Sequence, residues 1–130
     1  MSFLSAVINH IEAANIAVFG QDMFANEYPS KAPNECLLVM DTGGMEPNQY
    51  LPIGNPTIQV LSRALSYLEA EEKARQVSKL FHGETAKHNY LIGSYYIYKS
   101  NAMQEPGWIG KDEKNRDEVS VNFVFKIKRT

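Results

Sequence analysis

The sequence predicts an α+β fold, in which a mixed, largely antiparallel sheet carries an N-terminal helix and a central helix on one face. Three observations support this prediction. Apolar residues recur every three or four positions near the start of the chain and again in its middle, and they alternate with polar residues close to the C-terminus. With 130 residues the chain has the length of one domain, so we expect residues 1–130 to form a single unit.

The first predicted helix spans about residues 3–15. Its apolar side chains are spaced so that they share one stripe of an α-helix. This stripe consists of Leu4, Val7, Ile8, Ile11 and Ala14. A short apolar strand is predicted directly afterwards, over residues 16–19, and it ends at Gly20.

The second predicted helix follows Ser66 and ends before Gly83, a residue type that commonly comes after the last turn. Ser66 and Glu69 have the spacing of a capping box, in which the hydroxyl and the carboxylate each accept a free backbone N–H. The predicted buried stripe is Ala70, Ala74, Val77 and Phe81. Opposite charges four residues apart predict two ion pairs. These are Glu69 with Lys73, and Glu71 with Arg75.

Strands are predicted over residues 36–40, 57–63, 90–99 and 118–128. The first is a continuous apolar run, which is typical of a strand covered on both faces. It contains the single cysteine, Cys36, for which we expect a buried thiol that acts as a small hydrophobic side chain. The last has the clearest alternation. Its apolar face consists of Val119, Val121, Phe123, Phe125 and Ile127.

The charge balance and the polar residues exclude several classes of function. The formal net charge is −2 and the two signs are interspersed, whereas proteins that grip nucleic acid along a broad surface cluster Lys and Arg. The basic cluster Lys126, Lys128 and Arg129 is interpreted as a solvated strand end, and a phosphate contact is the alternative. No stretch approaches the roughly 20 apolar residues that cross a bilayer. The histidines share no metal-ligand spacing, so we expect neither a metal nor a cofactor.

Long segments without periodicity are the least ordinary feature of the sequence, and they lie at residues 20–34, 43–56 and 100–117. Structureless loops beyond about 12–15 residues are uncommon in compact domains. These segments carry aromatic and Met side chains, which are atypical of disordered linkers and enriched at protein interfaces. We therefore predict contacts with neighbouring subunits, and folding over the same domain is the alternative. The candidate interface residues are Met23, Phe24, Tyr28, Met45, Tyr50, Leu51, Ile53, Met103, Trp108 and Ile109.

Asp41-Thr42-Gly43 is the sharpest candidate for catalysis. Homodimeric retropepsin-like aspartic proteases carry an apolar strand ending in Asp-Thr-Gly in each subunit, and the paired carboxylates share a proton and activate water. Gly44 departs from the Ala or Ser that usually follows in those enzymes, and the predicted helices are foreign to their small β-fold. We favour a strand end with an Asp-started turn, so no catalytic residue is assigned.

The order of motifs resembles that of the bacteriophage tail terminators, a family also described as minor capsid or tail-completion proteins. The resemblance covers most of the chain. It begins with the N-terminal helix and the apolar strand that ends in Asp41-Thr42-Gly43-Gly44. A Pro-containing loop follows, then residues 56–63 lead into the Ala-rich helix, and residues 106–113 precede the closing strand.

The resemblance implies a structural virion protein rather than an enzyme. Six subunits would form a ring on the last ring of the tail tube, halt its polymerisation and offer a surface to the head-side connector. The partners would be copies of the same chain, the tail tube protein and a head-completion or connector protein. DNA would pass through the lumen without sequence-specific binding, and no membrane would be involved. The protein would be assembled in the host cytoplasm and reside in the tail or neck of the virion.

Two other functions stay open at the level of sequence. A neighbouring neck or head-completion protein of similar size is the structural alternative. The homodimeric retropepsin-like protease is the alternative from another class.

Overall fold

The computed structural model describes residues 2–46 and 49–128, and Arg129 of the basic cluster lies outside the described residues. The helices are α1 (Phe3–Ala13) and α2 (Tyr67–Phe81). The strands, in chain order, are β1 (Met23–Ala25), β2 (Cys36–Asp41), β3 (Ile53–Gly54), β4 (Thr57–Ala64), β5 (Lys87–Ile92), β6 (Tyr95–Ala102), β7 (Gly107–Lys111) and β8 (Asp117–Lys128).

The strands form one eight-stranded sheet with the order β1-β2-β4-β8-β6-β5, and β3 and β7 also pair with β8. β1 runs parallel to β2, and the other pairings between named strands in the described chain are antiparallel. β8 is the longest strand, with 12 residues. It pairs with β4 and β3 along one edge and with β7 and β6 along the other. The predicted α+β fold with a mixed, mostly antiparallel sheet is confirmed.

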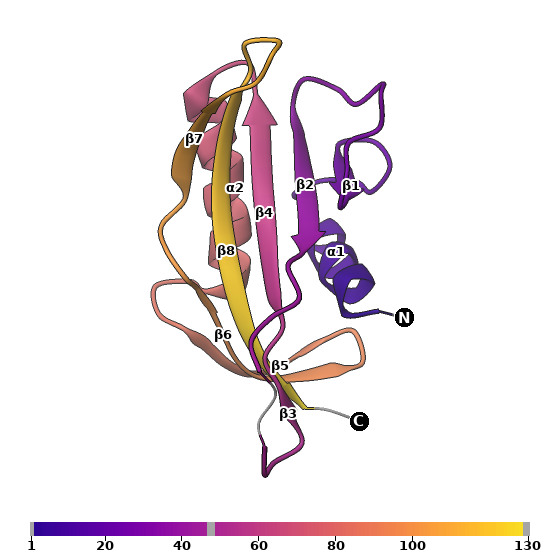
Figure 1. Ribbon diagram of the computed structural model, residues 1–130, viewed down its shortest axis with the longest axis vertical. Helices are drawn as coiled ribbons and strands as arrows, with labels where there is room; N and C mark the ends of the chain where they lie inside the picture. Colours follow the sequence, from indigo (N-terminus) through magenta and orange to yellow (C-terminus); the bar gives the residue numbers. More distant parts are fainter. Residues whose placement is uncertain (1, 47–48, 129–130) are drawn as a thin grey trace.

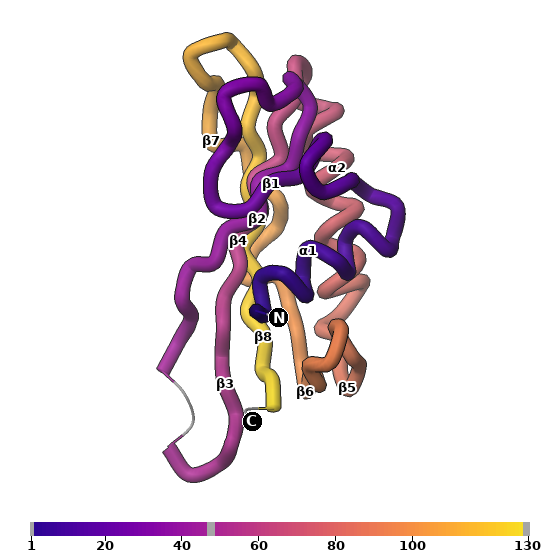
Figure 2. The backbone as a smooth tube through the Cα atoms, turned by 90° about the vertical axis from the view of Figure 1, so that its right-hand side faces the viewer, coloured from indigo at the N-terminus to yellow at the C-terminus, as the bar shows by residue number. Residues whose placement is uncertain are grey.

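Both helices pack on the same face of this sheet (Figure 1, Figure 2). The ring of Phe81 on α2 lies 5.3 Å from that of Phe123 and 5.4 Å from that of Phe125, edge to face. The stripe predicted for α2 is confirmed, and that for α1 is confirmed except for Ala14, which lies beyond the end of the helix and is exposed. The main core joins the apolar stripes of the helices to the inward side chains of β2, β4 and β8. It includes Val7, Ile8, Ile11, Leu37, Val39, Ile58, Val60, Val77, Phe81, Val121, Phe123 and Phe125.

The ends of α2 follow the predicted signals. The Oγ atom of Ser66 accepts a hydrogen bond from the backbone N–H of Glu69 at 3.3 Å. Gly83 follows the helix with a positive φ of 68°, which glycine adopts without steric cost. Arg75 forms the predicted ion pair with Glu71 at 2.7 Å.

The predicted ion pair between Glu69 and Lys73 is wrong. The Nζ atom of Lys73 instead donates to the backbone carbonyl of Ile16 at 2.9 Å. A carbonyl left free after α1 is satisfied in this way, and the bond ties α2 to the segment that follows α1.

The predicted strand over residues 16–19 is also wrong, because this segment has an irregular backbone. The carboxylate of Asp22 accepts the N–H of Val18 at 2.7 Å, and the carboxylate of Glu12 accepts the N–H of Phe19 at 2.9 Å. These side chains satisfy the backbone donors that a strand would pair with a neighbouring strand.

The single strand predicted over residues 90–99 is in fact the hairpin of β5 and β6. Ile92 pairs with Tyr95, so Gly93 and Ser94 form a two-residue turn between them. The apolar side chains on both sides of the turn hide it from a search for periodicity.

The long segments predicted to lack periodicity contain three of the short strands, namely β1, β3 and β7. Each pairs with a strand that the sequence predicts: β1 with β2, and β3 and β7 with β8. These three strands are therefore ordered by pairing with other strands of the same chain.

Candidate functional site

Residues 42–46 and 49–56, called the arm below, continue the β2–β4 hairpin beyond the body of the sheet. The N–H of Thr42 donates to the carbonyl of Thr57 at 3.2 Å, and the N–H of Met45 donates to the carbonyl of Asn55 at 2.8 Å. β3 lies within the arm and pairs with the end of β8, which anchors the arm at its base. The arm forms the lower end of the molecule in Figure 1.

The arm exposes large apolar side chains. Tyr50 is 87% exposed, Leu51 57% and Met45 55%, whereas Ile53 is half-buried. Exposed apolar side chains are ordinary when they are scattered, but a group of them on one projecting segment is a candidate contact surface. These residues are four of the predicted interface set, and the structure places them together.

The opposite half of the molecule carries a second group on β7 and the segment before it (Figure 1). Trp108 is 55% exposed and Ile109 57%. The indole Nε1 of Trp108 donates to Asp117 at 3.0 Å, and Lys111 pairs with the same carboxylate at 3.2 Å. Asp117 therefore fixes the ring in place while much of its surface faces solvent. Met103, between β6 and β7, is 49% exposed.

Met23, Phe24 and Tyr28 point into their own subunit, which corrects their prediction as interface residues. Met23 is fully buried in the main core, because β1 pairs with β2 and turns this side chain inward. Phe24 packs with Cys36 and Leu38 on the sheet face opposite the helices. The predicted burial of the thiol is confirmed, and burial raises the pKa of Cys36.

Residues 26–35 fold over that opposite face and are held there by Arg63. The guanidinium carbon of Arg63 lies 4.2 Å from the ring centroid of Tyr28, a cation–π contact. Its Nη2 atom donates to the carbonyl of Pro33 at 2.7 Å. For this segment the alternative in the sequence analysis is correct, since it packs on its own domain.

Sequence reasoning missed an apolar group at the start of α2. Leu65 is 60% exposed, Tyr67 40% and Leu68 75%. Their positions in the sequence could have indicated this exposure, because they precede or flank the buried stripe of α2 and do not belong to it. Other exposed large apolar residues that were missed are Val18, Phe19, Leu91 and Tyr96.

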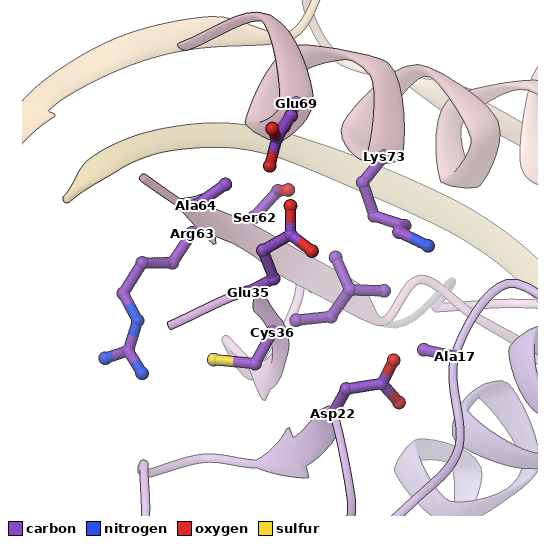
Figure 3. Close-up of a pocket in the computed structure, with 10 residues that line it drawn as sticks. Ala17, Asp22, Glu35, Cys36, Ser62, Arg63, Ala64, Glu69 and Lys73 are labelled. Carbon is purple, nitrogen blue, oxygen red and sulfur yellow. The ribbon is translucent and has the colours of Figure 1, made fainter. Parts of the chain in front are cut away.

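A small cavity of about 100 Å³ lies between β2, β4 and the start of α2 (Figure 3). Glu35 and Glu69 line it with their carboxyl groups close together, and the hydrogen bond to Glu35 raises the pKa of Glu69. Ligand pockets typically measure about 300 Å³ or more, so this cavity suits water rather than a substrate. In the described part of the chain, no group of His, Cys, Asp and Glu residues could hold a metal ion.

Asp41 ends β2 in a turn, as the favoured interpretation of Asp41-Thr42-Gly43 predicts. Its carboxylate accepts the N–H of Gly43 at 2.8 Å, and its own N–H donates to the side chain of Asn26 at 3.0 Å. The side chain is exposed on a sheet covered by two helices. These helices are the elements that the small β-fold of the protease alternative lacks.

A family model and a solved structure match this chain. No helix in the described chain is long and apolar enough to cross a membrane. No curated protein sequence matches the chain. A solved structure of a chain from the virion of a native gene transfer agent particle has the same fold, with a TM-score of 0.68 and 10% identity, covering 98% of this chain and 95% of that one. The family model of the bacteriophage tail terminator protein matches residues 10–129. The chain therefore belongs to the bacteriophage tail terminator family and is a structural component of the phage virion.

Proposed function

We propose that the chain is the tail terminator itself, a subunit of a hexameric ring that caps the tail tube and joins it to the head-side connector. The observation that carries this proposal is the position of the exposed apolar side chains. Most of them lie on the arm at one end of an elongated subunit, and on β7, the segment before it and the start of α2 toward the other end (Figure 1). A subunit between tube and connector needs contact surfaces at both ends.

Ring formation requires further contacts at the sides. A closed ring of identical subunits uses head-to-tail contacts, in which two different surfaces of the chain meet. Val18 and Phe19 after α1, and Leu91 and Tyr96 on the β5–β6 hairpin, expose apolar side chains outside the two end groups and are dissimilar surfaces of this kind. Aromatic residues and Met are enriched at protein interfaces, which fits the composition of both groups.

The structural neighbour supports the same proposal at the level of the particle. That chain comes from the virion of a gene transfer agent particle. Because the two chains cover nearly all of each other, the whole fold is suited to a place in such a particle. In the proposed ring, DNA passes through the lumen.

Deleting the gene from the phage tests the proposal. Without a terminator the tube continues to polymerise, so we expect overlong tails that lack heads, measured by electron microscopy. The control is the wild-type gene supplied in trans, which should restore the normal length. Tails of normal length without heads would contradict the terminator role and assign the chain to the neck, as a head-completion or connector protein.

A further inference from the structure

The sheet face opposite the helices is divided into two parts. Residues 26–35 cover the part near Arg63 with apolar contacts. The other part, on β4, β8 and β6, lies beyond this cover and is polar. Strand alternation and register place these residues on it: Gln59, Asn122, Val124, Lys126, Lys99 and Asn101. We call this part the open face, and none of its named residues carries a carboxylate.

Two lysines stand directly opposite each other on the open face. Lys99 on β6 is the cross-strand partner of Lys126 on β8, and both side chains are exposed. Like charges in this position repel each other and weaken the sheet. The ion pairs found in the described part of the chain include neither lysine. The chain therefore keeps an unneutralised positive pair on an exposed face of its sheet, although its formal net charge is −2.

A shallow groove of about 160 Å³ accompanies the two lysines. Asn55, Lys99, Asn101 and Lys126 supply its polar groups, and Val124 and Phe125 form the rest of its lining. Amide groups can donate hydrogen bonds to phosphate oxygens, and lysine supplies the charge. The chemistry of this groove is suited to an anion.

A nucleic acid fits the open face better than a protein partner does. Lysine is depleted at protein interfaces, and aromatic residues and Met are enriched there. Most of the exposed aromatic and Met side chains of this chain lie elsewhere, on the arm, at the start of α2 and around Trp108, while Tyr96 lies further along β6 and Phe19 follows α1. Duplex DNA presents a dense row of phosphates, which two lysines and neighbouring amides can contact in any sequence.

We propose that the open face lies along the path of the DNA, where Lys99 and Lys126 contact backbone phosphates. This inference rests on the proposed function, because it assigns the wall of the ring's lumen. Each subunit would contribute only two cations. The contact would therefore be weak and independent of sequence, as a channel through which DNA moves requires.

A titration of the isotope-labelled full chain with a short DNA duplex, followed by nuclear magnetic resonance at low salt, tests the proposal. We expect amide shifts that concentrate on the open face. Two phosphate contacts predict binding about tenfold weaker at about 200 mM salt than at about 50 mM. The double variant Lys99→Gln with Lys126→Gln should lose binding by about tenfold or more at low salt. It should melt at the same or a higher temperature, because the cross-strand repulsion is removed.

The matched control is Lys31→Gln with Lys79→Gln, which removes the same charge from exposed residues outside the open face. It should bind the duplex like the wild type. Shifts that lie elsewhere, or equal losses in both double variants, would overturn the proposal. An all-glutamate peptide that binds the open face as tightly as the duplex at equal charge concentration would assign the face to an acidic protein partner instead.

This outcome is separable from that of the proposed function. The titration uses the isolated chain and needs no ring, whereas tail length in the deletion phage reports on termination alone. If the duplex does not bind the open face but the deletion phage makes overlong tails, only the assignment of the DNA-facing wall is overturned.

Discussion

Two tyrosines of this chain differ in whether their hydroxyl group has a hydrogen-bond partner. The hydroxyl of Tyr28 is buried without a hydrogen-bond partner, and burial raises the pKa of this group. The hydroxyl of Tyr90 bonds to the hydroxyl of Ser100, which in turn donates to the carbonyl of Phe81 at 2.6 Å. The Tyr28 side chain therefore contributes to stability through its ring, which lies under the guanidinium of Arg63.

The two tyrosines give a matched pair of substitutions. Tyr28→Phe keeps the ring and removes an unpaired hydroxyl, so the free energy of unfolding should stay the same or rise by up to about 1 kcal/mol. Tyr90→Phe breaks a partly buried hydrogen bond and should lower it by about 1 kcal/mol. Urea denaturation measures both. Equal losses in the two variants would contradict the assignment of an unpaired hydroxyl to Tyr28.

His10 makes the stability of the protein depend on pH. Burial, and then the charge of Lys87, lower the pKa of His10 below its usual value of 6.5. The folded state therefore favours the neutral imidazole, while the unfolded chain binds the proton more readily. The stability linked to His10 is complete above about pH 6.5 and is lost as the pH falls through the lowered pKa.

The histidine effect can be isolated by comparing two variants. Between about pH 7.5 and about pH 5.5, His10→Gln should lose less of its free energy of unfolding than the wild type does. His88→Gln, which changes an exposed histidine on β5, should lose as much as the wild type. The account of His10 fails if its variant follows the wild-type pH profile.

At the scale of elements, the sequence predicts well what local patterns encode. The stripes of α1 and α2, the Ser66 cap and the alternation of β8 are all properties of neighbouring residues, and the structure confirms them apart from Ala14, which lies just past the end of α1. β1 and β7 are too short for a period to emerge, and glycines interrupt β7. They exist because β2 and β8 offer free edges, which no local pattern reveals.

The β5–β6 turn depends on a single glycine. Gly93 has a φ of 60°, and a Cβ atom built there would meet the Cβ of Ala6 at 3.5 Å. Gly93→Ala should lower the free energy of unfolding by about 1–2 kcal/mol, because an L side chain is strained in this region. Gly107→Ala on β7, where φ is not positive, should change it by less than about 0.5 kcal/mol. Thermal or urea unfolding measures both variants. An equal loss of unfolding free energy in Gly107→Ala and Gly93→Ala would contradict the special role of Gly93.

The arm should matter for assembly and not for folding. Tyr50→Ser with Leu51→Ser changes side chains that are 87% and 57% exposed. The free energy of unfolding should therefore move by less than about 0.5 kcal/mol. In the phage, the same variant should reproduce the overlong, headless tails of the deletion. If the variant folds normally and yields tails of normal length joined to heads, the arm is not one of the contact surfaces.

The sequence predicts only part of the candidate site, because whether an apolar loop faces outward depends on tertiary pairing. Met23 and Tyr50 lie in similar aperiodic segments, yet Met23 enters the core through β1 and Tyr50 remains on the arm. The open face is likewise invisible in the sequence. Lys99 and Lys126 lie far apart in the chain, and only the register of β6 against β8 joins them.

At the scale of the whole molecule, the subunit is organised around its contacts. The helices close one face of the sheet (Figure 1, Figure 2). Residues 26–35 close part of the other face, and the open face remains between two ends that expose apolar side chains. Imaging the neck of the intact virion by electron cryomicroscopy tests this organisation most directly. We predict six copies at the head-side end of the tube, with Tyr50, Leu51 and Trp108 buried between chains. A particle in which the arm and β7 face solvent would contradict the account.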